Sequence, residues 1–177
     1  MNRTSLIYLT GMMGSWKTTV GKKLAKALSL SFVDIDDEVE KITGKTISDV
    51  FRRDGITHFR NLETYALKKT SQAKNTVIAT GGGIVLKPTN REIMMENGFI
   101  VLLKASPNVL ARRIQNIQTR PVLKSNLPII YQLETLWEER RPYYEDIADY
   151  TLNTDSLSPK NITDTIKEYL TSQNAND

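Results

Sequence analysis

A glycine-rich segment near the N-terminus has the composition of a loop that binds phosphate groups. Residues 11–18, GMMGSWKT, follow an apolar run and open a helix-like segment, and they nearly match the pattern G-x-x-x-x-G-K-[ST]. In such loops, backbone N–H groups at a helix N-terminus surround the phosphates. Lys17 is then expected to neutralise the phosphates, and the Thr18 hydroxyl to help hold Mg²⁺. An ordinary turn before a helix that begins with Lys-Thr is the alternative.

One position of this loop departs from the pattern. Trp16 stands where a glycine normally precedes the lysine. Glycine at that place allows unusual backbone angles and a close approach of phosphate, whereas an indole could strain the turn or fill the space that phosphate needs. A tolerated natural variant, an introduced substitution and a relative that has lost nucleotide binding are three interpretations that the sequence leaves open.

Residues suited to ligand binding also follow the second and third apolar runs. Asp34 and Asp36 are two apart, and in an extended segment this spacing points both carboxylates the same way. One could bind Mg²⁺ through water while the other accepts a proton from a substrate hydroxyl. Alternatively, Asp36 caps a helix that begins at residue 37, and Asp34 is solvated. Gly81, Gly82 and Gly83 would let a ligand lie against the backbone, although a flexible loop is the other interpretation.

Several arginines could bind an anionic substrate. Arg60 and Glu63 are three apart and therefore share a helical face, for which a solvent-exposed ion pair is the default expectation. Arg120 and Arg140 offer further guanidinium groups that suit carboxylate or phosphate. Taken singly, each arginine is more often a surface charge.

The elements that must position these residues alternate along the chain. Strands are expected at residues 6–10, 31–33, 76–79, 99–103 and 149–152, and helices at 17–28, 38–69 (interrupted near 44 and at 54–55), 90–97, from 107, 130–139 and 159–170. Crossovers of this length indicate a parallel sheet covered on both faces. Ligands of such sheets bind at the carboxyl ends of the strands, where the glycine and aspartate clusters lie.

Composition restricts the chemistry further. The chain has 177 residues with 24 basic and 20 acidic side chains, one histidine and no cysteine. This length suits one domain, and the missing residue types exclude a thiol nucleophile and a two-histidine metal site. The net charge of +4 favours anionic ligands but is too small to indicate nucleic acid. No targeting or membrane-spanning segment is evident, so a cytoplasmic protein is expected.

Together these motifs resemble the shikimate kinases, a family of small P-loop kinases. The matching motifs are the phosphate loop, Asp34-x-Asp36, Phe59-Arg60-x-x-Glu63, Gly81 to Gly83, Arg120-Pro121-x-Leu123 and Arg140-x-Pro142-x-Tyr144. The resemblance implies an α/β fold of three layers with a five-stranded parallel sheet in the order 2-3-1-4-5. It also implies a single domain, 1–177, with a substrate-binding insertion at about 36–65 and a lid at about 114–126.

The resemblance further implies the reaction and its residues. The reaction is phosphorylation of the 3-hydroxyl of shikimate by ATP with Mg²⁺, within aromatic amino-acid biosynthesis. The implied catalytic residues are Asp36, Lys17 and Arg120. Those implied to bind ATP are Gly11, Gly14, Ser15, Trp16, Lys17, Thr18, Thr19, Arg113 (against the adenine) and Arg120, and those implied for the metal are Thr18 and Asp34. Those implied to bind shikimate are Asp36, Arg60, Gly81, Gly82, Gly83 and Arg140.

Two other functions stay open from the residues alone. Because Trp16 departs from the loop pattern, a catalytically silent relative could bind shikimate or a partner without binding ATP. A kinase for another small acceptor, such as gluconate or a nucleotide, is the second alternative. Shikimate is the expected partner, with no nucleic acid and no membrane, and a monomer is expected.

Overall fold

The protein folds around one parallel β-sheet. The structure, a computed structural model, describes residues 5–114, 122–123 and 126–174. The strands are β1 (Leu6–Thr10), β2 (Ser31–Asp34), β3 (Thr76–Ala79), β4 (Phe99–Lys104) and β5 (Tyr150–Asn153), and all adjacent pairs are parallel. Their order is β2-β3-β1-β4-β5. The α/β fold and the strand order expected from the sequence are therefore confirmed.

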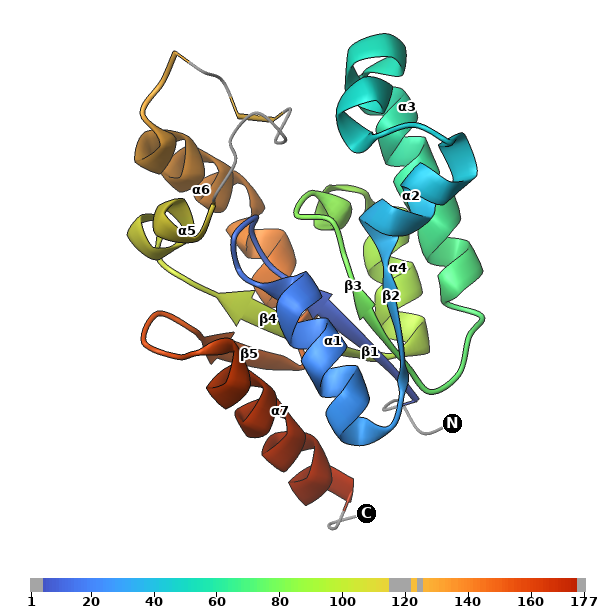
Figure 1. Ribbon diagram of the computed structural model, residues 1–177, viewed down its shortest axis with the longest axis vertical. Helices are drawn as coiled ribbons and strands as arrows, with labels where there is room; N and C mark the ends of the chain where they lie inside the picture. The colour runs from blue at the N-terminus through green and yellow to red at the C-terminus, as the bar shows by residue number, and fades with distance from the viewer. Residues whose placement is uncertain (1–4, 115–121, 124–125, 175–177) are drawn as a thin grey trace.

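Helices cover both faces of this sheet, so the molecule has three layers (Figure 1). They are α1 (Lys17–Leu28), α2 (Ile35–Thr43), α3 (Ile47–Thr70), the short 3₁₀ helix η2 (Ile84–Leu86), α4 (Pro88–Asn97), α5 (Pro107–Arg113), α6 (Ile129–Ile147) and α7 (Pro159–Asn174). Alternate residues of β1 point to opposite faces. Leu6 and Tyr8 join the core under α3, α4 and α6, whereas Ile7 and Leu9 join the core under α1 and α7.

Helix α6 is longer than the sequence indicated. The expected helix at 130–139 ends before Pro142, and proline is a residue that usually ends a helix. The structure continues the helix through Pro142 to Ile147. The additional turns bury Tyr144 and Ile147 in the core. Packing of these two side chains therefore outweighs the hydrogen bond that proline removes.

The local geometry of the two aspartates also differs from the expectation. Helix α2 begins at Ile35, so Asp36 is helical and not part of an extended segment. Asp34 is the N-cap of α2, and its Oδ1 accepts a hydrogen bond from the backbone N–H of Asp36 at 3.0 Å. The alternative in which Asp36 caps the helix is therefore wrong as well. Asp34 is buried and not solvated.

The insertion lies on one side of the carboxyl edge of the sheet. Figure 1 shows α2 and α3 on that side, and α5 and α6 on the other. Gly55 interrupts α3 with φ 82° and ψ 169°, at the break that the sequence predicted. Most of the expected lid, including Arg120, lies outside the described residues. None of the described helices has both the length and the apolar character needed to cross a membrane.

Candidate active site

Two neighbouring cavities lie at the carboxyl ends of the central strands. The larger, about 230 Å³, is formed by residues 13–14 and 16–19 together with Asp34, Thr80 and Arg113; we call it the loop cavity. The smaller, about 70 Å³, lies between α3, the three glycines and Arg140; we call it the arginine cavity. Met13, Asp36 and Gly82 line both cavities. The structure thus brings the motifs of the first three strands together, as their positions predicted.

The phosphate loop is held in shape by its own lysine. Lys17 Nζ donates hydrogen bonds to the carbonyl oxygens of Gly11 and Met12, both at 2.9 Å. Gly11 must be glycine because its φ is +136° and a Cβ atom there would lie 2.5 Å from the carbonyl oxygen of Leu103. Helix α1 begins at Lys17, directly after the loop. The loop therefore carries a cation and a helix N-terminus, the two features that favour bound phosphate.

Trp16 fits into this loop without breaking it. Its backbone has φ 66° and ψ 23°, which is the left-handed conformation that glycine adopts easily. Its carbonyl accepts the first hydrogen bond of α1, from the N–H of Val20 at 2.8 Å. A side chain in this conformation costs about 1–2 kcal/mol. The indole packs against the core under α1 and α7 and faces Arg113, whose Cζ lies 3.6 Å from the ring centroid.

Thr18 and Asp34 present oxygen atoms in the loop cavity. Thr18 Oγ1 donates a hydrogen bond to Asp34 Oδ2 at 2.6 Å. Oxygen ligands are those that Mg²⁺ prefers, and it is usually held by one or two carboxylates together with water and substrate phosphates. The described residues contain no cluster of three or more metal-binding side chains. This pair therefore fits a Mg²⁺ that relies on a phosphate ligand for the rest of its coordination.

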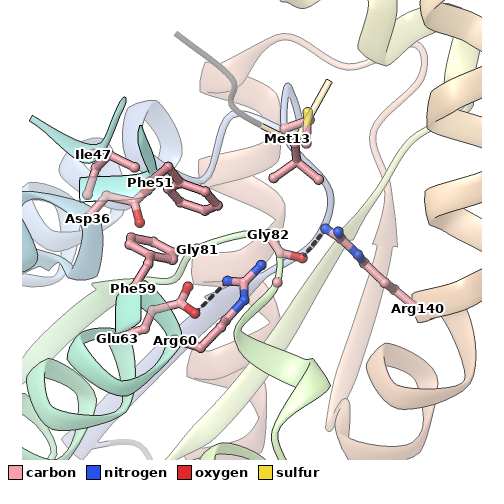
Figure 2. A pocket seen from close by; sticks show the side chains of 12 residues that line it. Met13, Asp36, Ile47, Phe51, Phe59, Arg60, Glu63, Gly81, Gly82 and Arg140 are labelled. Carbon is pink, nitrogen blue, oxygen red and sulfur yellow. Dashed lines mark hydrogen bonds and ion pairs between the residues drawn. The ribbon is translucent and has the colours of Figure 1, made fainter. Parts of the chain in front are cut away.

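A buried ion pair forms the floor of the arginine cavity. Arg60 Nη1 lies 2.6 Å from Glu63 Oε2, with the two side chains 11% and 0% exposed (Figure 2). The expectation of an exposed pair is wrong because this face of α3 packs beneath the three glycines. Burial raises the pKa of Glu63 above its ordinary value, while Arg60 and Arg140 act in the opposite direction.

Gly81 and Gly83 make room for this ion pair. A Cβ atom at Gly81 would lie 2.2 Å from Glu63 Oε1, and one at Gly83 would lie 2.0 Å from Arg60 Nη2. Real carbon atoms do not approach so closely, so any larger residue would displace the pair. The sequence predicted only a backbone surface for a ligand. It missed this second requirement because a contact between residues 60–63 and 81–83 depends on the tertiary fold.

Arg140 reaches the glycines from the other side of the cavity. Its Nη1 donates a hydrogen bond to the carbonyl oxygen of Gly82 at 3.0 Å, and the side chain is 3% exposed. The hydroxyl of Tyr144 donates to the same carbonyl oxygen, and burial raises the pKa of Tyr144. Figure 2 shows Arg60 and Arg140 approaching Gly82 from opposite directions. The sequence assigned no role to Tyr144, although its spacing of four from Arg140 places both on one helical face.

Sequence reasoning also missed the apolar wall of the arginine cavity. Ile47, Phe51 and Phe59 line it from α3, and the two phenyl centroids are 4.5 Å apart. The spacing of four between Ile47 and Phe51 was an available signal for a shared helical face. The cavity therefore combines two cations with an apolar surface.

These observations define the class of the protein. A parallel sheet in the order 2-3-1-4-5, with a phosphate loop between its first strand and first helix, is the fold of P-loop kinases. The model of the shikimate kinase family matches residues 13–171. The chain belongs to the shikimate kinase family and is therefore an enzyme of the kinase type.

Individual relatives agree with this assignment. The chain is 44% identical to a shikimate kinase of Caldanaerobacter subterraneus subsp. tengcongensis, over 93% of each chain. It is 39% identical to a shikimate kinase of Pelotomaculum thermopropionicum, over 95% of this chain and 96% of the relative. A structure of shikimate kinase from Acinetobacter baumannii in complex with shikimate matches with a TM-score of 0.92 at 34% identity, covering 96% and 94% of the two chains. None of these findings favours a catalytically silent relative.

Proposed function

We propose that the protein transfers the terminal phosphoryl group of ATP to the 3-hydroxyl of shikimate. The observation that carries this proposal is the shared wall between the two cavities, formed by Met13, Asp36 and Gly82. A phosphate donor in the loop cavity and an acceptor in the arginine cavity would meet at this wall. Family membership and the relative that binds shikimate support the choice of acceptor.

The arginine cavity has the chemistry that shikimate requires. Shikimate carries one carboxylate and several hydroxyls on a small carbon ring. Arg60 and Arg140 would bind the carboxylate through charge-assisted hydrogen bonds, which are roughly twice as strong as neutral ones. The backbone of Gly81 to Gly83 would bind ring hydroxyls, and Phe51 and Phe59 would contact the carbon ring.

The loop cavity has the chemistry that ATP requires. The amides of the phosphate loop, including those of Gly14 and Ser15, would surround the phosphates, and Lys17 would neutralise them. Arg113 would lie against the base and Thr19 would contact the nucleotide. Thr18 would hold Mg²⁺, with Asp34 acting through water, and a bound Mg²⁺ supplies positive charge at the phosphate oxygens.

Asp36 has the position of the catalytic base. As the acceptor oxygen forms its bond to phosphorus and the bond from phosphorus to the leaving ADP oxygen breaks, Asp36 would accept the hydroxyl proton. Lys17 would stabilise the negative charge on the transferred group. Arg120 is proposed to add a further positive charge from the lid.

We also propose a domain organisation, an oligomeric state and a location for the protein. We regard residues 1–177 as one domain that acts as a cytoplasmic monomer. Equilibrium sedimentation would contradict the monomer if it gave a dimer mass at micromolar concentration.

Product analysis tests the proposed reaction directly. The full chain is incubated with ATP, Mg²⁺ and shikimate, and ³¹P NMR identifies the phosphorylated position. Shikimate 3-phosphate and stoichiometric ADP are the expected products. The methyl ester of shikimate is the matched control, because it lacks the carboxylate that Arg60 and Arg140 would bind. Absence of phosphorylated shikimate, or equal rates with acid and ester, would contradict the proposal.

A further inference from the structure

Trp16 places an aromatic ring at the edge of the loop cavity, where the usual pattern has only glycine. The indole and the guanidinium of Arg113 both line this cavity, and Arg113 Cζ lies over the ring at 3.6 Å from its centroid. We propose that Trp16 is a base-binding residue and that its indole, together with Arg113, forms a stacking surface for the nucleobase of the phosphate donor. This inference rests on the proposed function, since it refines the nucleotide half of the same site.

The indole is held in place by the core and by Arg113. The backbone at Trp16 is left-handed and its carbonyl accepts the N–H of Val20, so the loop keeps its turn. One part of the ring packs against the core under α1 and α7. Arg113 contributes a cation–π contact, which stabilises such a pair more strongly when it is partly desolvated. Together these contacts offset the strain of a large residue at this position.

Arg113 is fixed as firmly as the indole. Its Nη1 donates to Thr154 Oγ1 at 2.9 Å and its Nη2 donates to the carbonyl oxygen of Thr154 at 2.5 Å. Thr154 is fully buried, and its N–H donates to the carbonyl oxygen of Lys104 at 2.8 Å. Partial burial lowers the pKa of Arg113 while Asp155 raises it, and the guanidinium stays charged. The two planar groups therefore form a preorganised surface and need little ordering when a ligand binds.

The residues that line the loop cavity indicate which kind of ligand would use this surface. Lys17, Thr18 and Thr19 line the part that suits phosphates, and Trp16 and Arg113 add two planar groups. A ligand with phosphates at one end and a flat aromatic base at the other matches this arrangement. Stacking of a base on an aromatic side chain accepts any base, because every base has a π-face. We therefore expect tight binding of adenine nucleotides with only modest discrimination against guanine nucleotides.

Comparing ligands with and without a base tests this role. Isothermal titration calorimetry with Mg²⁺ measures the binding of ADP and of pyrophosphate to the full chain and to three variants. Trp16→Gly restores the usual residue and removes the ring, whereas Trp16→Phe keeps an aromatic ring. Trp137→Phe is the matched control, because Trp137 contacts Lys104 and Tyr144 and does not line the loop cavity. Thermal unfolding of each variant verifies that it is folded.

The base-stacking role predicts a selective loss. In Trp16→Gly the dissociation constant of ADP is expected to rise about tenfold, while that of pyrophosphate stays unchanged. Trp16→Phe is expected to retain most of the ADP affinity, and Trp137→Phe all of it. An unchanged or lower dissociation constant of ADP in Trp16→Gly would overturn the inference, the latter by identifying the indole as an obstruction. Equal losses for ADP and pyrophosphate would overturn it too, since they indicate damage to the loop.

These outcomes are independent of the acceptor. The titrations contain no shikimate, so selective loss of ADP binding would support the role of Trp16 even if shikimate were not phosphorylated. Conversely, shikimate phosphorylation with unchanged ADP binding in Trp16→Gly would overturn the role of Trp16 and leave the proposed reaction intact.

Discussion

The arginine cavity and the loop cavity share a wall, yet their cationic side chains are held in different ways. In the arginine cavity, a fully buried carboxylate of Glu63 contacts Arg60 at 2.6 Å. In the loop cavity, Lys17 Nζ donates hydrogen bonds to two carbonyl oxygens of its own loop. The arginine cavity thus depends on a contact between two helical side chains, whereas the loop cavity depends on the backbone of the loop itself.

This difference bears on how each cavity binds its ligand. Close packing of Gly81 and Gly83 against an ion pair makes the arginine cavity sensitive to the addition of a single carbon atom. The loop cavity has tryptophan in its lining, and the backbone of Trp16 adopts the left-handed conformation that glycine adopts easily. The arginine cavity is therefore the one in which a larger side chain is less easily accommodated. Substitutions there should affect shikimate, and substitutions in the loop cavity should affect ATP.

Substitution at the shared wall should have the largest effect. Asp36→Asn keeps the shape of the side chain but removes the base, so we expect kcat to fall by about 10²–10⁴-fold. Binding of both substrates should change far less, since each cavity keeps its other residues. Steady-state kinetics with ATP and shikimate varied in turn measure this. The matched control is Asp37→Asn, one residue away on the exposed surface; a similar loss there would contradict the assignment.

Substitution in the arginine cavity should weaken the binding of shikimate and leave that of the nucleotide unchanged. Gly83 has φ −111°, so Gly83→Ala introduces no backbone strain, but its Cβ would collide with the Arg60 guanidinium. We expect the KM for shikimate to rise roughly 10- to 100-fold, the size of a lost hydrogen bond to a charged group. Gly55→Ala is the control, because it meets no neighbour and only strains the backbone. Weaker ADP binding in Gly83→Ala would show that the two halves are not separable.

Substitution in the loop cavity should weaken the binding of MgATP and leave that of shikimate unchanged. Thr18→Val removes the hydroxyl that donates to Asp34, and we expect the KM for MgATP to rise about tenfold as one charge-assisted hydrogen bond is lost. Thr18→Ser keeps the hydroxyl and should restore the affinity. Titration of the activity with Mg²⁺ should show a higher requirement in Thr18→Val alone. An unchanged Mg²⁺ requirement would contradict the assignment of Thr18 to the metal site.

The smallest expected effect concerns the buried carboxyl group of Glu63 and the pH dependence of stability. Burial raises the pKa of Glu63 above the ordinary value of 4.5, so the native protein binds more protons than the unfolded chain over that pH range. The free energy of unfolding should therefore fall as the pH rises through this range, by at most about 1.4 kcal/mol per pH unit. Glu63→Gln should lack this slope while binding shikimate less well. Urea unfolding from pH 4 to 8 measures it, and equal slopes in both proteins would contradict the assignment.

Much of the fold could be predicted from the sequence because its signals are local. The apolar runs of β1 and β3 are short and bounded by glycine or polar residues, and their observed bounds agree with those expected. Helix α6 was predicted too short, and the local signal of Pro142 gives no reason to extend it. Only the burial of Tyr144 and Ile147 explains why the helix continues.

The candidate site was predictable in its polar members but not in its apolar wall or its contacts. The loop pattern indicated Lys17, and the resemblance to the shikimate kinases indicated Asp36 and Arg60. That Asp34 caps α2, and that Arg60 pairs with a buried Glu63, depends on where helices begin and how they pack. Arg120 lies outside the described residues, so its role stays a prediction.

The sequence alone determined the order of strands and helices and the chemical groups available to the site, because periodicity and residue type are properties of short segments. Only the tertiary structure decided which of those groups meet. Residues 60–63, 81–83 and 140–144 are far apart in the chain, and their contacts exist because three elements pack against one sheet edge. The same reason applies to Trp16: its departure from the loop pattern is visible in the sequence, but its contact with Arg113 arises only because the fold brings the start of α1 to the end of α5.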